Sequence, residues 1–295
     1  MEIFLAQWIN GISLGSIYAL LVIGFNLMSI VAGVTHFAYP HVVVLSMYVI
    51  WYVLGATGDN APIAILAGIG SGVAISLATE PIFRPLTARR AWIASFIATL
   101  GLSMIITDAM AHGMHAGRVI PFPTSFVGTV PVYQLGVATL FRGQLMTFIG
   151  CISVMVGFFY LLYRTQTGRA FRSMAENPFV ARLRGIPIAR TSRNSYVIAG
   201  LLGGMSSVFL SMALRYASPA LGNFLALKVV TIALLAGLGN LRGGLIAALI
   251  IGMVESMVTG YVPGEWAGAV VFGAMLIAIM ARPAGVFSQE AQSSG

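Results

Sequence analysis

Long runs of apolar residues, separated by short arginine-rich stretches, limit what this chain can fold into more than any other feature. The runs fall near 8–31, 40–55, 63–80, 92–113, 145–163, 194–214, 226–239, 243–260 and 266–282. A helix needs about 20 residues to cross a bilayer, whereas the strands of a membrane β-barrel are short and alternating. Only 8% of the residues are charged, against about a quarter in soluble domains. The sequence therefore predicts an all-α polytopic membrane protein with about eight or nine membrane segments.

The positions of the arginines predict which side of the membrane each loop faces. Short loops rich in Lys and Arg stay on the cytoplasmic side. The stretch RPLTARR (84–90) holds three arginines, and the region 164–193 holds seven. With both inside, twelve arginines lie in inside loops and three in outside loops. We therefore expect the N-terminus outside, and we attribute the net charge of +8 to membrane orientation and not to nucleic-acid binding.

Two apolar segments, 40–55 and 226–239, are short for a bilayer, and each follows an irregular break. The breaks are GVTHFAYPH (33–41) and RYASPALGN (215–223). In the predicted topology the helices before the two breaks run in opposite directions. Paired broken helices in inverted halves point to the binding site of a transporter. We therefore expect an inverted repeat, with 226–239 as either a span or a re-entrant segment.

The region 173–187, SMAENPFVARLRGIP, is unusually polar for this chain and carries signals for a short helix. Asn177 is a good N-cap, and Pro178 suits the first helical position. Gly185 can close the helix, and Pro187 prevents its continuation. The spacing predicts a helix over 178–184, after an earlier helical stretch from about 168 to 176.

This short helix needs something to pack against, because a two-turn helix is not stable alone in water. Phe179 and Leu183 are four residues apart and share a face that Arg182 leaves free. One interpretation is a cytoplasmic helix that inserts into a groove of a partner. The alternative is an ordinary positively charged loop.

The chain itself lacks the means to hydrolyse ATP. Its only lysine, Lys228, lies in an apolar run and not in a G-x-x-x-x-G-K-[ST] phosphate loop. The single cysteine, Cys151, leaves no disulfide, and two nearby histidines without a third ligand support a zinc site poorly. We expect a protein that is not an enzyme and binds no cofactor itself.

Several stretches resemble the permeases of branched-chain amino acid ABC importers. GRAFRSMAENPFVARLRGI (168–186) resembles their cytoplasmic coupling segment, and NGISLGSIYALLVIGFNLM (10–28) resembles their first helix. EPIFRPLTARRAWIASFIATLGLSM (80–104) and the glycine-rich stretch 217–255 resemble later signatures, whereas 114–144 carries none. The resemblance implies one transmembrane permease domain over 1–295, with a cytoplasmic coupling segment at 164–193.

The resemblance also implies partners. These are a paralogous second permease, two cytoplasmic ATPase subunits that bind Mg-ATP, and an extracytoplasmic solute-binding protein. The location implied is the cytoplasmic (inner) membrane of a bacterium, with several passes. Coupling to the ATPases is assigned to Glu176, Asn177, Pro178, Phe179, Arg182, Leu183 and Gly185.

The stretch HFAYPH (36–41) departs from the family pattern N-F-A-H-G-D/E. The resemblance implies uptake of branched-chain amino acids or related small organic solutes. Because the stretch lacks the acid that could pair with the ammonium of an amino acid, alternatives stay open beside it: an anionic carboxylate, such as an aromatic acid, or a urea- or amide-type compound. The candidate pathway residues are His36, Tyr39, His41, Lys228 and Thr231.

Other interpretations of these residues remain. The histidines could bond to backbone carbonyls at the break, and Lys228 could snorkel to the surface or pair with Glu255. A stand-alone ion-coupled carrier is the alternative function, and it would need no ATPase.

Overall fold

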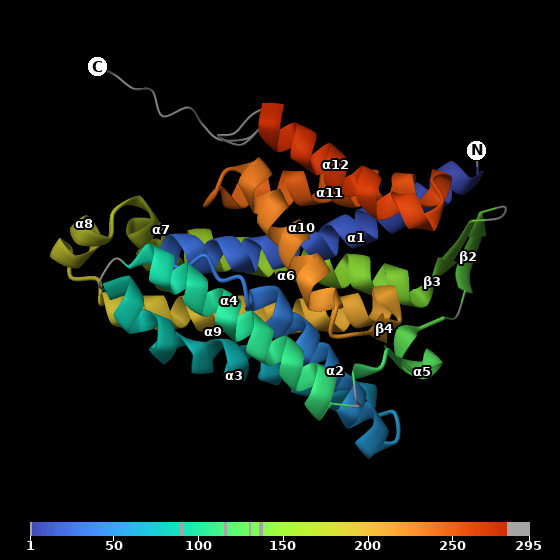
Figure 1. The fold of residues 1–295 in the computed structure, drawn as a ribbon, viewed down its shortest axis with the longest axis horizontal. Coiled ribbons are helices and arrows are strands. Elements are labelled where there is room, and N and C mark those ends of the chain that lie inside the picture. The colour runs from blue at the N-terminus through green and yellow to red at the C-terminus, as the bar shows by residue number, and fades with distance from the viewer. Residues whose placement is uncertain (1, 89–90, 115–116, 130, 136–137, 282–295) are drawn as a thin grey trace.

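The structure is a computed structural model that describes residues 2–88, 91–114, 117–129, 131–135 and 138–281. Helices dominate this part of the chain (Figure 1). In chain order the elements are α1 (Glu2–Leu27), η1 (Met28–Ala32), α2 (Tyr39–Thr57), α3 (Ala61–Ala88), α4 (Trp92–Asp108), η2 (Ala109–Gly113), β1 (Ile120–Pro121), α5 (Thr124–Val127), β2 (Pro131–Leu135), β3 (Ala138–Phe141), α6 (Arg142–Arg164), α7 (Gln166–Glu176), α8 (Pro178–Leu183), α9 (Ile188–Leu214), β4 (Tyr216–Ala217), α10 (Leu221–Ala236), α11 (Leu241–Tyr261) and α12 (Gly264–Ala281).

Seven helical segments of the described chain are long and apolar enough to cross a membrane, and two shorter apolar helices accompany them. The all-α polytopic fold is therefore confirmed. The two predicted short segments differ from each other: α2 has 19 residues and is long enough to span, whereas α10 has only 16. Pro40 lies in the first turn of α2, a position that tolerates proline because the first N–H groups of a helix have no helical partner.

One boundary differs clearly from the sequence-based prediction. The third apolar run was expected to end near residue 80, but α3 continues to Ala88 and contains Pro81 and Pro85. Arg84 therefore sits on the last turns of a helix and not in a loop. Its guanidinium lies 3.8 Å from the carboxylate of Glu80, one turn earlier.

The helix α1 forms the centre of the bundle. Its residues from Ile17 to Leu27 are almost entirely inaccessible, on every face of the helix. A helix that is apolar all round belongs in such a position. It packs along α11, and it also contacts α9, α6 and α10.

Glycines set the close approach between α1 and α11. A Cβ on Gly11 would lie 2.8 Å from the Cα of Met253, and one on Gly15 would lie 2.9 Å from the Cα of Leu249. On the facing helix, a Cβ on Gly252 would meet the backbone of Gly15. Small residues let membrane helices pack backbone to backbone, where dispersion contacts are densest.

The pair α9 and α3 repeats this arrangement. A Cβ on Gly200 would lie 2.8 Å from the Cα of Val73, and one on Gly204 would lie 2.7 Å from the Cα of Ile69. On the facing helix, a Cβ on Gly72 would meet Gly204. Gly11 and Gly15 thus contact the backbone of α11 in the way that Gly200 and Gly204, with the same spacing in sequence, contact the backbone of α3.

Helices α1 to α4 and helices α9 to α12 therefore share one arrangement. Helix α1 corresponds to α9, α2 to α10 and α3 to α11, and each first helix packs on the third helix of the other half. The third helices share a pattern: Gly72, Ser76 and Thr79 in α3 match Gly252, Ser256 and Thr259 in α11. In Figure 1, α1 runs away from the labelled N-terminus, whereas α9 runs back toward that end. This supports the expected inverted repeat.

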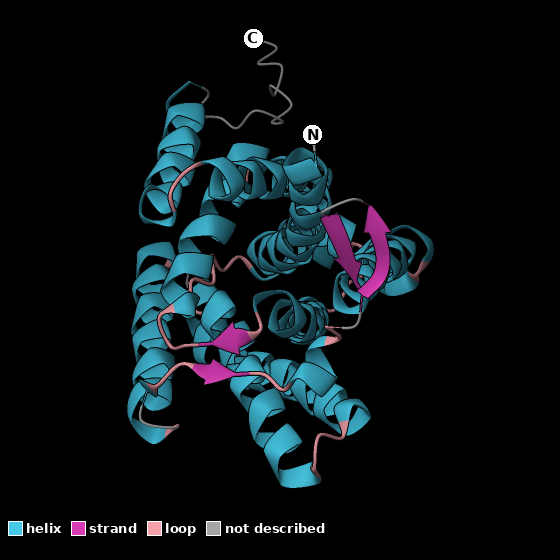
Figure 2. Ribbon diagram, turned by 90° about the vertical axis from the view of Figure 1, so that its right-hand side faces the viewer, coloured by secondary structure: helices cyan, strands magenta, loops and turns pink. Residues whose placement is uncertain are grey.

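The two ends of the bundle carry different elements. Helices α7 and α8 lie at one end, and the N-terminus lies at the other (Figure 1). Figure 2 looks onto the N-terminal end, where the two small antiparallel sheets lie. One sheet pairs β2 with β3, and the other pairs β1 with β4. The predicted coupling segment is thus separated from both sheets by the length of the spans.

Candidate functional site

The predicted breaks, 33–41 and 215–223, lie between helices over residues 33–38 and 215–220 only, and each leads into a helix whose first turn meets that of the other. His41 lies in the first turn of α2, and Asn223 lies in the first turn of α10. Their side chains are joined by a hydrogen bond, with His41 Nε2 3.0 Å from Asn223 Oδ1. The residues occupy the same place in the repeat, three positions after Ala38 and Ala220. The contact therefore links the two halves at matching positions.

The imidazole of His41 is held on its other side as well. Its Nδ1 lies 3.3 Å from the carbonyl oxygen of Phe37, and the side chain is buried. A Cβ on Gly222 would lie 2.5 Å from the ring, so the imidazole rests directly on the backbone of α10. His41 thus satisfies a backbone carbonyl at the break and also contacts the opposite half.

His36 lies deeper, in the irregular segment itself, with 1% of its surface exposed. Its Nε2 is 3.3 Å from the hydroxyl oxygen of Thr79, and its ring meets that of Phe83 edge-on at 4.9 Å between centroids. Within the described part of the chain, its Nδ1 has no hydrogen-bond partner. Buried polar atoms of this kind are uncommon in folded proteins.

Tyr39 packs between helices α1 and α9. Its hydroxyl donates a hydrogen bond of 3.0 Å to the carbonyl oxygen of Ala199. A Cβ on Gly24 of α1 would collide with the side chain of Tyr39, and a Cβ on Gly203 of α9 would come within 3.2 Å of its ring. Tyr39 therefore fixes the start of α2 against both central helices.

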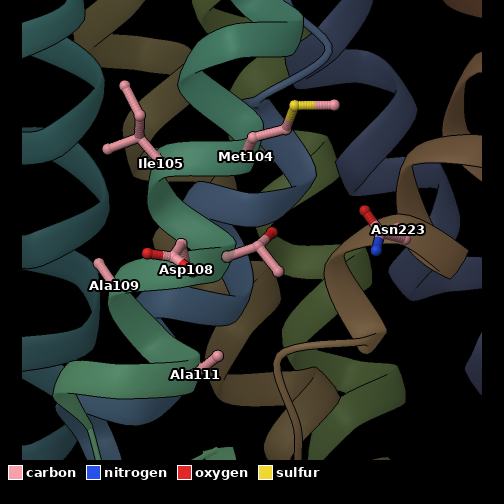
Figure 3. Close-up of a pocket in the computed structure, with 7 residues that line it drawn as sticks. Met104, Ile105, Asp108, Ala109, Ala111 and Asn223 are labelled. Carbon is pink, nitrogen blue, oxygen red and sulfur yellow. The ribbon is translucent and has the colours of Figure 1, made fainter.

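A groove runs between α4 and α10 beside this meeting point. It has a volume of about 730 Å³ and is lined by Met104, Ile105, Thr107, Asp108, Ala109, Ala111 and Asn223. Figure 3 shows Asn223 on one side and the side chains of α4 on the other. The amide that bonds to His41 therefore also borders an open groove.

Lys228 forms a compact charged network with two other helices. Its Nζ lies 2.5 Å from Glu255 Oε1 on α11 and 3.0 Å from the hydroxyl oxygen of Tyr18 on α1. The Tyr18 hydroxyl donates to the other carboxylate oxygen of Glu255 at 3.0 Å. The side chains of Lys228 and Glu255 are only 16% and 14% exposed. Lys228 is therefore paired in the interior and does not snorkel.

Thr231, the remaining pathway candidate, is half-buried one turn further along α10. It lies outside the set of residues that line the cavity beside Lys228. The structure thus brings His36, Tyr39 and His41 together around one break and leaves Lys228 and Thr231 on a separate helix.

The predicted coupling helix forms as the sequence indicated. Asn177 caps α8, and its Oδ1 accepts hydrogen bonds from the backbone N–H groups of Phe179 and Val180 at 2.9 and 3.3 Å. Pro178 occupies the first turn, and Gly185 adopts a left-handed backbone with φ of +78°. Helix α8 ends at Leu183, one residue earlier than predicted.

The surface of α8 is apolar where it faces away from the protein. Phe179 and Leu183 are 67% and 73% exposed, whereas Ala181 on the opposite side is 1% exposed and packs against the protein. Glu176 and Arg182 are exposed beside this face. Large apolar side chains rarely stay this exposed at the end of a membrane bundle unless a partner covers them.

Helix α7 connects α8 firmly to the bundle. Its Phe171 and Met174 are buried, and the helix contacts η1 and α9. The segment η1 is a π-helix that immediately precedes the first break. Such π-helical turns often occur at functional sites. A rigid connection therefore runs from the exposed helix α8 to the break that contains His36.

Sequence reasoning alone missed part of this site. Asn223 and Tyr18 were not among the candidates, although Asn223 stands at the same position after its break as His41 does. Aligning the two halves on their breaks is the signal that would have found it. Among the described residues, no group of three or more His, Cys, Asp or Glu side chains could hold a metal ion.

Comparison with known proteins identifies the family. The family described as branched-chain amino acid transport system / permease component matches residues 7–280. The high-affinity branched-chain amino acid transport system permease protein BraD of Pseudomonas aeruginosa is 25% identical, over 97% of this chain and 96% of its own length. The permease protein LivH of Escherichia coli K12 is similar to the same extent over the same shares. Among solved structures, PsaBC from Streptococcus pneumoniae in complex with Fab covers 94% of this chain and 90% of its own, at 13% identity and a TM-score of 0.47. This chain belongs to the family of branched-chain amino acid transport system permease components.

Proposed function

We propose that this protein is the membrane-spanning subunit of an ATP-binding-cassette importer in the bacterial inner membrane. It takes up branched-chain amino acids or related small organic solutes that an extracytoplasmic binding protein delivers. The observation that carries this proposal, beside family membership, is the capped helix α8 with its exposed apolar face. A stand-alone carrier would have no use for such a helix.

The energy for transport comes from separate subunits, since the chain has no phosphate-binding loop. Two cytoplasmic ATPases hold Mg-ATP, and each permease subunit of the importer presents one coupling helix. A paralogous permease completes the pair of membrane subunits. Residues 1–295 act as one permease domain, with 164–193 as its cytoplasmic coupling segment and the N-terminus outside.

Helix α8 docks in a groove on an ATPase through Phe179 and Leu183. Burying one such side chain contributes about 1.5–3 kcal/mol, so the two provide most of an anchor. Asn177, Pro178 and Gly185 keep the helix rigid, while Glu176 and Arg182 orient it through charges at the rim. A rigid element can transmit a displacement that a flexible loop would absorb.

Closure of the ATPases moves α8 and, through α7, the π-helical turn η1. Because η1 leads directly into the first break, this displacement reaches Tyr39 and the hydrogen bond between His41 and Asn223. The pathway residues His36, Tyr39, His41, Lys228 and Thr231 then change from an outward-facing to an inward-facing arrangement. Two packed arrangements of this kind, and not a continuous deformation, are the usual basis of such switches.

Co-purification tests the docking step directly. The amount of ATPase recovered with the permease should fall at least about tenfold in the double variant Phe179→Asp/Leu183→Asp, because two side chains that would be buried in the docked complex become charged. Val119, which is 60% exposed in the outer loop, offers a matched control as Val119→Asp. Equal ATPase recovery from the double variant and the wild type would overturn the coupling role of α8.

A further inference from the structure

Two arginines share one tyrosine ring at the end of the bundle that carries α7 and α8. The guanidinium carbons of Arg172 on α7 and Arg242 on α11 lie 5.3 and 5.2 Å from the centre of the Tyr163 ring. Arg242 Nε donates a hydrogen bond of 3.1 Å to the Tyr163 hydroxyl, and Arg172 donates one to the carbonyl oxygen of Leu162. The fold therefore brings two like charges from different helices to one ring.

No acid in the described part of the chain neutralises these two arginines. The ion pairs there are formed by other cations, namely Arg84, His112 and Lys228. Two like charges held this close repel each other. A guanidinium has five N–H donors, and within the described residues each of these two makes one hydrogen bond. The two arginines therefore keep both positive charge and N–H donors available for an anion.

A cavity of about 280 Å³ adjoins the arginines between α6, α7 and α11. Its polar lining comes from Tyr163, Arg172, Glu176, Asn240 and Arg242. Glu176 is exposed and makes no ion pair with either arginine. A water molecule occupies about 30 Å³ in the liquid, so the cavity has room for a phosphate group and part of the molecule that carries it.

The arginines lie at the depth of lipid headgroups. Tyr163 is the last residue but one of α6, and Arg242 is the second residue of α11, and both helices are long and apolar enough to cross a membrane. Beyond Arg242, Ile246 and Ile250 follow at intervals of four residues on the same face of α11 and are 44% and 48% exposed. A charged end that continues into an exposed apolar stripe matches the headgroup and the acyl chain of a phospholipid.

We infer that this cavity binds the phosphate of an anionic phospholipid such as phosphatidylglycerol. Arg172 and Arg242 donate hydrogen bonds to the phosphate oxygens, and the Tyr163 ring holds the two guanidinium groups in place. Ile246 and Ile250 receive an acyl chain. Basic pockets between membrane helices bind lipid headgroups in this way. Free phosphate would use the arginines but not the apolar stripe, so the lipid is the occupant that fits both.

The bound lipid joins parts of the protein that the proposed mechanism sets in motion. The cavity wall also includes Leu27 of α1 and Ile30 of η1. A headgroup there rests against the connection that leads from α8 to the first break, and it links α7 to α11. This site goes beyond the proposed importer function and is the same whichever solute is transported.

Native mass spectrometry of the purified full chain compares phosphatidylglycerol with phosphatidylcholine in one detergent. The wild type should prefer phosphatidylglycerol, because the choline cation faces two arginines. In Arg172→Gln/Arg242→Gln the affinity for phosphatidylglycerol should fall at least about tenfold, since two charge-assisted hydrogen bonds are lost. The matched control, Arg190→Gln/Arg193→Gln, removes two exposed arginines at the start of α9 and should change the affinity by less than about twofold.

Three results would overturn the inference: equal affinity of the wild type for both lipids, unchanged affinity in the cavity variant, or an equal loss in the control variant. An excess of inorganic phosphate should leave the lipid bound, because phosphate has no acyl chain. Displacement of the lipid would show a site for free phosphate instead. If the cavity variant loses ATPase recovery and keeps its lipid affinity, the arginines serve the ATPase and the inference is wrong.

A single variant decides the matter if the double variant does not fold. The side chain of Arg242 is exposed, so Arg242→Gln leaves no gap in the packed interior. Its affinity for phosphatidylglycerol should fall at least about threefold, because one charge-assisted hydrogen bond is lost. Wild-type affinity in this variant would contradict the site.

Discussion

The two breaks of this protein occupy the same position in an inverted repeat, yet they are built differently. The first is the more buried of the two: Val34, His36 and Ala38 are at most 1% exposed. The second is more open, with Arg215 in a left-handed conformation at φ of 66° and Tyr216 39% exposed. The second break is also paired to the segment Ile120–Pro121 through β1 and β4.

The two halves therefore share their helix packing but differ in what surrounds their breaks. The first break is connected to α8 through α7, which packs on η1 just before the break. The second break leads to the charged cavity beside Lys228. The contact between His41 and Asn223 is the place where the two meet. We interpret the first break as the one through which motion of α8 reaches the proposed pathway residues.

The largest effect should come from breaking the shared scaffold. Gly15→Leu and Gly204→Leu each force a side chain into facing backbone at less than 3 Å, so we expect the folded protein to be lost in both cases. The recovery of monodisperse protein in size-exclusion chromatography measures this. Gly101→Leu is the control, because a Cβ there meets nothing within 4 Å. If only one of the two variants fails, the halves do not share their packing.

The next largest effect should come from the charged pair of Lys228 and Glu255, which the first half lacks at the matching positions. Lys228→Met leaves the Glu255 carboxylate buried without its partner, which costs about 3–5 kcal/mol of the free energy of unfolding. Ser46→Ala at the matching position removes only a hydroxyl bonded to the carbonyl of Val42 and should cost about 1 kcal/mol. Thermal unfolding in detergent compares them. Equal losses would mean that the charges are not special to the second half.

The smallest effect concerns the link between the breaks. His41→Ala and Asn223→Ala each remove one side of the hydrogen bond between the breaks, which is worth about 1 kcal/mol. His41→Ala also removes the contact with the carbonyl of Phe37, so its own loss should be the larger of the two. The double variant should be more stable than the sum of the two losses predicts, because both act on the same contact. A double-mutant cycle on the unfolding free energy measures this coupling. Strict additivity would show that the contact carries no energy between the halves.

Much of the fold could be predicted from the sequence because its signals are local. Asn177, Pro178 and Gly185 define α8 through neighbouring backbone groups, and apolar length alone defines the spans. Even so, α3 continued through Pro81 and Pro85, since a membrane helix tolerates proline where neighbouring groups satisfy the backbone carbonyls that it leaves free.

The candidate site was less predictable because its contacts are distant in sequence. His41 and Asn223 are 182 residues apart, and Lys228 and Glu255 are 27 apart on different helices. The face of α10 that turns inward is set by packing against α1, α2 and α11. Because α10 carries apolar residues on all sides, the sequence alone does not indicate which face this is. The repeated glycines were visible in the sequence, but their partners at Gly72 and Gly252 were identified only by the structure.

ATP-driven uptake tests most directly whether motion at α8 reaches the solute. In proteoliposomes with the complete importer, leucine uptake should require ATP, and Phe179→Asp/Leu183→Asp should abolish uptake while Val119→Asp leaves it unchanged. Leucine uptake that persists after ATP depletion, or at the wild-type rate in the α8 variant, would contradict the coupling of this permease to an ATPase.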